Sequence, residues 1–317
     1  MLIIFSALAA IIPMLLYLVL IWKFDRYDRE PFKLVFTNYL WGALGAIVLA
    51  LIGSFLLTSI ASIFIKDDLQ LSRFGAIVVA PVVEEITKGL FLLITITTNK
   101  FDNITDGIVY GGAIGLGFGM TENFLYFITY GGLISSLIML VIVRTLFSAV
   151  MHCVSTATLG AFLGSAKFKS AAIKTFYAFV GLITAMTIHS IWNFSLSYKT
   201  IAPIGFLFIF ISIIIFISTF VISLRSERKI IFNELKEEIK NGLIPESHLL
   251  ILSSSQRERK GWLDERIRKD YIKAATSLAF RKVQLKNSSG LSKQYYERDI
   301  ENYRMFISSL LSGQQST

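Results

Sequence analysis

Long apolar runs are the feature that most constrains this chain. They are about 20 residues long, which is the length an α-helix needs to cross a hydrocarbon core of roughly 30 Å. Only 17% of the residues are charged, against about 25% in a typical soluble domain. We therefore expect an all-α, polytopic membrane protein with about seven transmembrane helices in one bundle, at residues 1–22, 34–60, 74–98, 105–129, 133–163, 172–194 and 201–224.

The chain changes character after Leu224, so we expect two domains: a transmembrane bundle at 1–224 and a cytosolic helical tail at 225–317. In the tail, amphipathic stretches at about 261–287 and 291–312 predict two helices. Asn241-Gly242 is typical of the end of an earlier helix. We interpret the tail as a small helical appendage without chemistry of its own.

The charges of the loops predict an orientation. Lys and Arg outnumber Asp and Glu by 13 to 10 in residues 1–224 and by 18 to 12 in residues 225–317. Because the excess lies in short loops and in the tail, the positive-inside rule and contact with anionic lipid explain it better than nucleic-acid binding does. In a seven-span arrangement one side carries most of the loop cations, and the other carries only Lys66, Arg73 and Lys199. The rule predicts a multi-pass protein of the cell membrane, with its N-terminus outside and its C-terminus in the cytoplasm.

Several ionisable residues lie inside the predicted spans. A charged side chain near the bilayer centre costs roughly 2.5–3.5 kcal/mol. Five of them would cost on the order of 12–17 kcal/mol, so they must pair with one another, become neutral or face a wet cavity. Such groups usually serve a function. They are Glu84, Glu85, Lys88, Glu122 and Arg144, accompanied by His152 and His189.

The spacing of the charges at 84–88 suits acid–base chemistry. Glu84 and Glu85 precede Lys88 by four and three residues, so on a helix the lysine can reach both carboxylates. One carboxylate can then stay ionised as a base while its neighbour is driven toward the neutral form. A structural ion-pair cluster is the alternative interpretation of this motif.

Glycines recur at every fourth position of the span at 105–129, namely at Gly107, Gly111, Gly115 and Gly119. Such a row forms a groove that another helix can approach closely. Glu122 follows on the same side, so we expect it in the protein interior.

Two of the three histidines lie within spans. His152 is followed by Ser155 and Thr156, and His189 precedes Asn193 by four residues, which places imidazole and amide on one helix face. An imidazole here could bind a metal or orient water, and the amide could donate to an oxyanion.

Taken in order, these motifs resemble the PrsW family of intramembrane proteases. The resemblance rests on Glu84-Glu85-x-x-Lys88, Phe118-x-x-x-Glu122-Asn123, the span with Arg144 and His152, His189-x-x-x-Asn193, and the stretch Asp25–Pro31 after the first span. It runs from about residue 20 to residue 224 and leaves out the tail. The related CAAX prenyl endopeptidases commonly have an arginine and a histidine where this chain has Lys88 and Glu122. These departures favour PrsW and argue against copying the prenyl-protease mechanism.

The resemblance implies hydrolysis of a peptide bond in a membrane-associated protein, which in the family's best-known case is a single-span anti-sigma factor. Glu84 or Glu85 would activate water, Lys88 would keep the carboxylates ionised, and Asn193 would stabilise the oxyanion. Glu122, His152 and His189 would bind a divalent metal, Zn²⁺ being the expected ion, or orient the water directly. Because the sequence has no His-Glu-x-x-His, the metal is inferred from the ligand types alone.

Two other classes of function fit the buried charges. A proton- or ion-coupled transporter also uses buried Glu, His and Lys, although the seven spans show no evident two-half repeat. A non-catalytic membrane scaffold or immunity-type protein could keep the same fold. The sequence indicates neither the identity of the substrate nor the oligomeric state.

Overall fold

The computed structural model describes residues 2–132, 134–198 and 200–313, and these residues form helices joined by turns, with no β-strand among them. The chain separates into two compact units. The first unit comprises Met1–Phe24 and Glu30–Phe220, and the second comprises Asp25–Arg29 and Val221–Thr317. The all-α class predicted for a membrane protein is confirmed.

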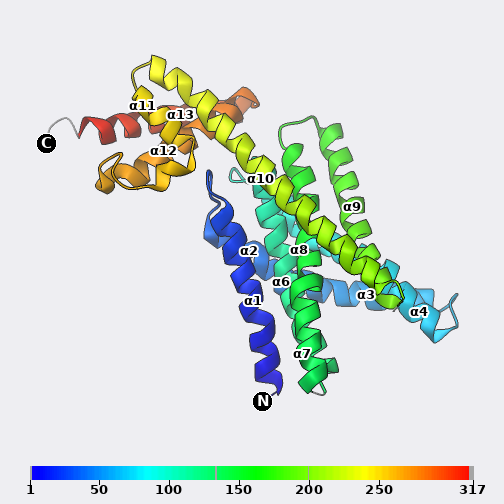
Figure 1. Ribbon diagram of the computed structural model, residues 1–317. Helices are drawn as coiled ribbons and strands as arrows, with labels where there is room; N and C mark the ends of the chain where they lie inside the picture. Colours follow the sequence, from blue (N-terminus) through cyan, green and yellow to red (C-terminus); the bar gives the residue numbers. More distant parts are fainter. Residues whose placement is uncertain (1, 133, 199, 314–317) are drawn as a thin grey trace. The chain divides into compact units, whose positions relative to one another are not determined.

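The helices of the first unit follow the predicted spans closely (Figure 1). Three of the spans consist of two α-helices joined directly by a short π-helical segment, which is labelled η. The elements are α1 (Leu2–Phe24), α2 (Phe32–Leu40), η1 (Trp41–Ala46), α3 (Ile47–Ala61), α4 (Asp68–Phe74), η2 (Gly75–Val79), α5 (Ala80–Thr95), α6 (Ile104–Tyr130), α7 (Ile134–Val143), η3 (Arg144–Ser148), α8 (Ala149–Ser165), α9 (Ala171–Ser197) and the first half of α10 (Ala202–Lys240).

Among the described residues, five helices are long and apolar enough to cross a membrane: Leu2–Phe24, Phe32–Ala61, Ser135–Ser165, Ala171–Ser197 and Ala202–Lys240. The other two predicted spans also form helices, α4–η2–α5 and α6, but they are the more polar ones. Residue 133, where the fifth predicted span begins, and Lys199 lie outside the described residues. The inward and outward placement of the loops stays a prediction.

Helix α6 is the centre of the first unit, and α8 packs along its glycines. A Cβ atom built on Gly107 would lie 2.0 Å from the carbonyl oxygen of Gly160. One built on Gly115 would lie 2.2 Å from the carbonyl oxygen of His152. The two backbones are therefore in direct contact, which confirms the predicted groove and places the His152 turn of α8 against α6.

Polar residues next to two of the spans fix where their helices begin. The side chain of Asp67 accepts a hydrogen bond of 2.8 Å from the backbone N–H of Gln70 at the start of α4. Asn103 caps α6, accepting from the N–H groups of Thr105 and Asp106, while Asp106 accepts in return from the N–H of Asn103. This reciprocal pair is a capping box, which satisfies N–H groups that a helix start otherwise leaves without partners.

The second unit contains the rest of α10, α11 (Glu246–Leu252), the 3₁₀ turn η4 (Ser255–Glu258), α12 (Glu265–Lys286) and α13 (Gly290–Ser312). Its apolar core includes Ile231, Leu235, Tyr271 and Leu278. Gly242 follows α10 with a φ of 73°, the left-handed conformation typical of a residue just after a helix end, so the Asn241-Gly242 prediction is confirmed. The apolar run ends at Leu224 but the helix does not, because no Gly or Pro interrupts it before Asn241. Residues 314–317 of the predicted tail lie outside the described part.

Candidate active site

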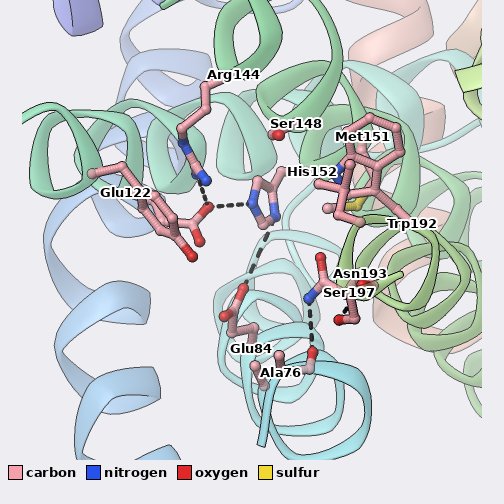
Figure 2. A pocket seen from close by; sticks show the side chains of 13 residues that line it. Ala76, Glu84, Glu122, Arg144, Ser148, Met151, His152, Trp192, Asn193 and Ser197 are labelled. Atoms are coloured by element: carbon pink, nitrogen blue, oxygen red, sulfur yellow. Dashed lines mark hydrogen bonds and ion pairs between the residues drawn. The ribbon is translucent and has the colours of Figure 1, made fainter. Parts of the chain in front are cut away.

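A pocket of about 330 Å³ opens among η2, α5, α6, η3, α8 and α9 of the first unit (Figure 2). One part of its wall is apolar, with Met151, Trp192 and Leu196. The polar part includes Glu84, Glu122, Arg144, His152 and Asn193. Charged and apolar groups around a concave site are the usual composition of a ligand or active site.

Helix α5 supplies the first cluster of charges. The Nζ atom of Lys88 lies 2.8 Å from Oε1 of Glu85 and 3.5 Å from Oε2 of Glu84, so the lysine reaches both carboxylates as its spacing predicts. Lys88 is fully buried, and its Nζ also lies 4.1 Å from the centre of the Phe118 ring. The ammonium group is thus held by two carboxylates and an aromatic face in a dry environment.

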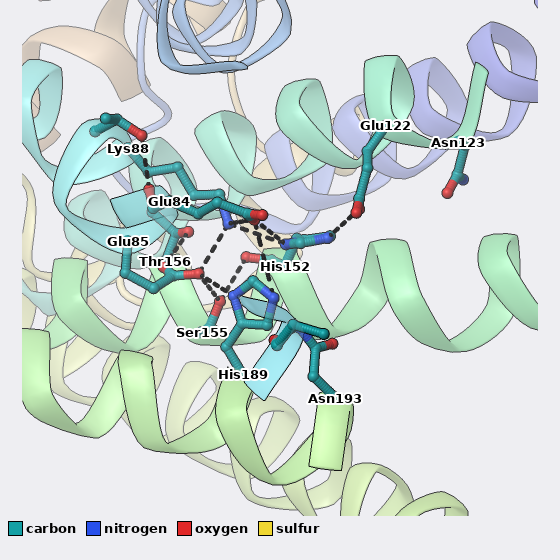
Figure 3. A network of polar contacts seen from close by, with 12 residues as sticks. Glu84, Glu85, Lys88, Glu122, Asn123, His152, Ser155, Thr156, His189 and Asn193 are labelled. Atoms are coloured by element: carbon teal, nitrogen blue, oxygen red, sulfur yellow. Dashed lines mark hydrogen bonds and ion pairs between the residues drawn. The ribbon is translucent and has the colours of Figure 1, made fainter. Parts of the chain in front are cut away.

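The two adjacent glutamates have different surroundings (Figure 3). Glu85 is fully buried and accepts hydrogen bonds from four side chains: Lys88, Ser155 at 3.1 Å, Thr156 at 3.1 Å and Nδ1 of His189 at 3.0 Å. Glu84 lines the pocket, and Lys88 donates to its Oε2 at the longer distance of 3.5 Å. Glu85 is therefore a fixed acceptor inside the bundle, whereas Glu84 is the carboxylate that a ligand can reach.

His152 is held through both ring nitrogens. Its Nε2 lies 2.6 Å from Oε2 of Glu122, and its Nδ1 lies 2.9 Å from Nζ of Lys88. Because an ammonium group can only donate, we assign Nδ1 as the acceptor and place the ring proton on Nε2, where it is donated to Glu122. The glycine contact fixes the backbone of this histidine, and these two bonds fix its ring.

Arg144, the first residue of η3, anchors Glu122. Its Nη2 donates to Oε2 of Glu122 at 2.6 Å, its Nε donates to Oδ1 of Asn123 at 2.9 Å, and its guanidinium lies 3.6 Å from the centre of the Tyr126 ring. The position of Arg144 inside a span was predicted from the sequence, but its contact with Glu122 was not. The sequence did contain a signal, because an arginine inside a span usually pairs with an acidic side chain or with backbone carbonyls.

Helix α9 brings Asn193 to the wall of the pocket and His189 next to Glu84 and His152, and their four-residue spacing places both on one side of the helix. Nε2 of His189 lies 3.9 Å from Oε2 of Glu84, and the ring packs edge-on against His152, with 4.8 Å between ring centres. The side-chain amide of Asn193 donates to the carbonyl oxygen of Ala76 in η2 at 2.8 Å. One of its two N–H groups is thereby used, and the amide is held at the edge of the pocket.

Three of these residues could hold a metal ion. Glu84, His152 and His189 each offer one ligand atom, and these atoms lie within 4.8 Å of one another. Two imidazoles and a carboxylate are a usual donor set for hydrolytic zinc, and Glu85 fixes the second nitrogen of His189 in the way carboxylates support zinc-bound histidines. The predicted ligand set contained Glu122. In the structure Glu122 contacts His152 at the opposite nitrogen, and Glu84 faces both imidazoles.

Comparisons with known proteins agree with this chemistry. The sequence profile described as "PrsW family intramembrane metalloprotease" matches residues 30–222, which contain all the site residues above. Protease PrsW of Bacillus subtilis is 28% identical over 55% of this chain and 74% of its own length. Protease PrsW of Oceanobacillus iheyensis is 32% identical over 59% of this chain and 81% of its own length, and that of Clostridioides difficile is 28% identical over 60% and 78%. No solved structure matches the chain.

The matched region ends near the boundary of the first unit, so nearly all of the second unit lies outside the match to the profile. Within that region a polar pocket lined by His152 and two glutamates opens in a bundle of apolar helices, and His189 packs against His152. The chain belongs to the PrsW family of intramembrane proteases.

Proposed function

We propose that the pocket cleaves a peptide bond of a membrane-anchored protein and that Glu84 is the carboxylate that acts on the reacting water. One observation carries this assignment: of the two adjacent glutamates, only Glu84 lines the pocket, while Glu85 is buried and accepts from four side chains. A general base must reach the proton that it removes. Glu84 meets this requirement and Glu85 does not.

The distances around Glu84 leave room for one water molecule. Its Oε2 lies 3.9 Å from Nε2 of His189 and 4.0 Å from Nδ1 of His152. A water bonded to two such atoms at about 2.8 Å each fits a gap of this width. As the water oxygen adds to the scissile carbonyl carbon, its proton passes to Glu84. The same proton then goes to the amine that leaves when the C–N bond breaks.

Asn193 is placed to stabilise the oxyanion of the tetrahedral intermediate. One N–H of its amide is held by Ala76, which fixes the plane of the group, and the second N–H remains for a ligand at the pocket edge. Donors fixed in advance in this way stabilise developing negative charge without reorganisation.

The surrounding residues act as positioning groups. Glu85 accepts from Nδ1 of His189 and thereby turns Nε2 toward Glu84. Arg144 and Glu122 hold His152 through Nε2. Lys88 supplies the positive charge that allows two carboxylates to lie side by side in a buried place.

The same three residues, Glu84, His152 and His189, fit a divalent metal, which we assign as Zn²⁺ from the donor types. When bound, zinc would polarise the scissile carbonyl group and lower the pKa of a water molecule. With the ion bound, Glu84 would be both a ligand and the carboxylate beside the water, while Glu122 would still hold His152 through Nε2. The Nδ1 lone pair of His152 already accepts from Lys88, so the lysine and a metal compete for one atom.

The size of the pocket bears on the form of the substrate. An α-helix with its side chains is about 10–12 Å wide, which is too wide for a pocket of about 330 Å³. A single-span substrate, such as an anti-sigma factor, would therefore have to unwind at the cleaved bond. By the charge bias of the loops, such a substrate would meet a protein whose N-terminus is outside and whose tail is cytosolic.

Reconstitution into liposomes with candidate single-span substrates tests this function. Wild type and Glu246→Gln should cleave alike, because Glu246 is an exposed residue of α11. Glu84→Gln should not cleave. Cleavage by Glu84→Gln within about twofold of wild type would remove Glu84 from the mechanism. Introducing glycine near the scissile bond of the substrate should speed cleavage, since it weakens the substrate helix by roughly 1 kcal/mol per residue.

A further inference from the structure

The second unit has a cavity of its own, of about 510 Å³, at the beginning of its part of α10. Three of its lining residues are cations on one helix face, Arg225, Arg228 and Lys229. Phe232 continues that face one turn later, and α11 with its C-cap supplies Leu250 and Ser253. The site thus combines a cluster of positive charge with an apolar patch.

The three cations differ from those cations of the same unit that are held in ion pairs. Lys282 bonds to Glu237 and Glu238, Lys286 to Glu234, and Arg304 to Glu238 and Glu301. Arg225, Arg228 and Lys229 make no ion pair with any described residue, and no carboxylate lines the cavity. Their charge is therefore available for an anion from outside the chain.

The apolar part of the cavity excludes a small inorganic anion as the complete ligand. Leu250 is 69% exposed although it adjoins the cations, and Phe232 is only partly buried. A free phosphate would satisfy the charges and leave these side chains in water. An anion joined to a carbon skeleton, such as a phosphate that carries a polyol, would contact both parts.

The position along α10 identifies where such an anion comes from. The apolar run of this helix ends at Leu224, so at 1.5 Å per residue Arg225–Lys229 extend no more than about 8 Å beyond it. The headgroup layer of one leaflet is roughly 5–8 Å thick, so phosphates of the bilayer lie at the level of these cations. A headgroup that continues from the phosphate toward water would pass Phe232.

We propose that this cavity binds the headgroup of an anionic phospholipid of the phosphatidylglycerol type. The phosphate contacts Arg225, Arg228 and Lys229, and the glycerol carbons lie against Phe232 and Leu250. The inference is independent of the proposed proteolytic mechanism, because none of these residues belongs to the pocket of the first unit.

The test uses the full chain in a neutral detergent and counts bound lipid by native mass spectrometry while phosphatidylglycerol or phosphatidylcholine is added. The variant is Arg225→Gln/Arg228→Gln/Lys229→Gln. The matched control removes the same charges from exposed positions elsewhere in the unit, Arg259→Gln/Arg298→Gln/Lys269→Gln. Each cation near a membrane surface strengthens lipid binding about fivefold, so the first variant should bind phosphatidylglycerol roughly a hundredfold more weakly. The control should stay within about twofold, and phosphatidylcholine should bind weakly throughout.

A second variant, Leu250→Ser, should weaken phosphatidylglycerol binding less than the triple variant, and it leaves every charge in place. Equal binding by the triple variant and wild type would overturn the proposal, as would equal losses in the triple variant and its control. Glycerol 3-phosphate that displaces the lipid at equal concentration would assign the cavity to a free anion. Displacement by a soluble glutamate-rich peptide would assign it to a protein partner. Either displacement would contradict a lipid site.

Discussion

Both units of this protein bury charged side chains, but they do so with different results. In the second unit, Glu238 is fully buried and both of its oxygens accept, from Lys282 at 2.7 Å and from Arg304 at 2.9 and 3.0 Å. In the first unit, Glu84 lines a pocket and lies about 4 Å from two imidazoles. Burial of charge is common to both clusters. The candidate active site differs from the Glu238 cluster because some of its polar atoms lie beside a cavity and remain available to a ligand.

The largest expected effect is the loss of proteolysis in Glu84→Gln. An amide of the same shape cannot accept the proton of the water, so we expect cleavage to fall by about 10²–10⁴-fold while the bundle stays folded. Glu85→Gln should lose activity as well, but it should also unfold more easily, since four donors lose a charged acceptor. Cleavage rates and thermal unfolding of both variants make the comparison. Normal activity with normal stability in Glu84→Gln would mean that access to the pocket does not identify the base.

Removal of the metal should also reduce the rate of cleavage. Purified active protein should hold about one zinc per chain, lose at least a hundredfold in cleavage on chelation, and recover when zinc is returned. His189→Gln should hold no metal. Lys88→Met should hold zinc at least as tightly as wild type, because it frees Nδ1 of His152. Active protein that contains no metal and resists chelators would contradict the zinc assignment and leave Glu84 acting on water alone.

A smaller effect should follow from a change that touches no polar side chain. A methyl group at Gly115 would lie 2.2 Å from the carbonyl oxygen of His152, so Gly115→Ala must push α8 away from α6. A displacement of about 1 Å in a catalytic group can cost 10²-fold, and we expect a loss of tenfold or more in cleavage. Gly132→Ala is the matched control, because a Cβ there would meet no atom within 4 Å. Equal activities would show that the groove does not position His152.

The sequence predicted the helices well because their signals are local. Apolar length defined α1 and α9 to within a few residues, and the row of glycines predicted the contact between α6 and α8. The three π-helical segments were not predictable. Each contains a residue that makes a tertiary hydrogen bond: Trp41 in η1 donates to the carbonyl of Thr87, the carbonyl of Ala76 in η2 accepts from Asn193, and Arg144 in η3 donates to Glu122. Such π-helical turns often occur at functional sites.

The site was predictable in its members but not in its arrangement. Adjacent residues point about 100° apart on a helix, so Glu84 and Glu85 face different directions, and the local sequence does not indicate which one faces the pocket. Ser155, Thr156 and His189 hold Glu85 away from the pocket by hydrogen bonds, and they lie 70 to 104 residues further along the chain. Tertiary packing also determines the partner of Arg144. Its carboxylate, Glu122, lies on another helix, and only the packing of η3 against α6 brings the two together.

In the second unit, Glu238→Gln should affect stability and leave chemistry unchanged. The change leaves Lys282 and Arg304 with a neutral partner, although Glu237 and Glu301 still contact them. We expect this unit to lose about 2–3 kcal/mol, below the full cost of breaking a buried pair. Glu301→Gln, which alters an exposed partner of Arg304, should cost less than about 1 kcal/mol. Hydrogen exchange of α12 and α13 measures the loss. A fall in cleavage as large as that in Glu84→Gln would remove the distinction between the two clusters.

The smallest expected effect is a pH dependence of the second unit. Burial lowers the pKa of His248 below its ordinary value of about 6.5, and the ring lies against Trp262 and 3.1 Å from the hydroxyl of Tyr271. Below pH 6.5 the unfolded chain therefore binds a proton that the folded unit resists. The stability from the neutral ring is complete above that pH and is lost as pH falls toward the lowered pKa. Hydrogen exchange in α12, corrected for the intrinsic effect of pH, should show this loss between about pH 7 and 5 in wild type and not in His248→Gln. The buried carboxylate Glu238 does not interfere, because hydrogen bonds from Arg304 and Lys282 outweigh burial and hold its pKa below the usual range. An equal loss in both proteins would mean that another group titrates, and His248 would then be a packing residue only.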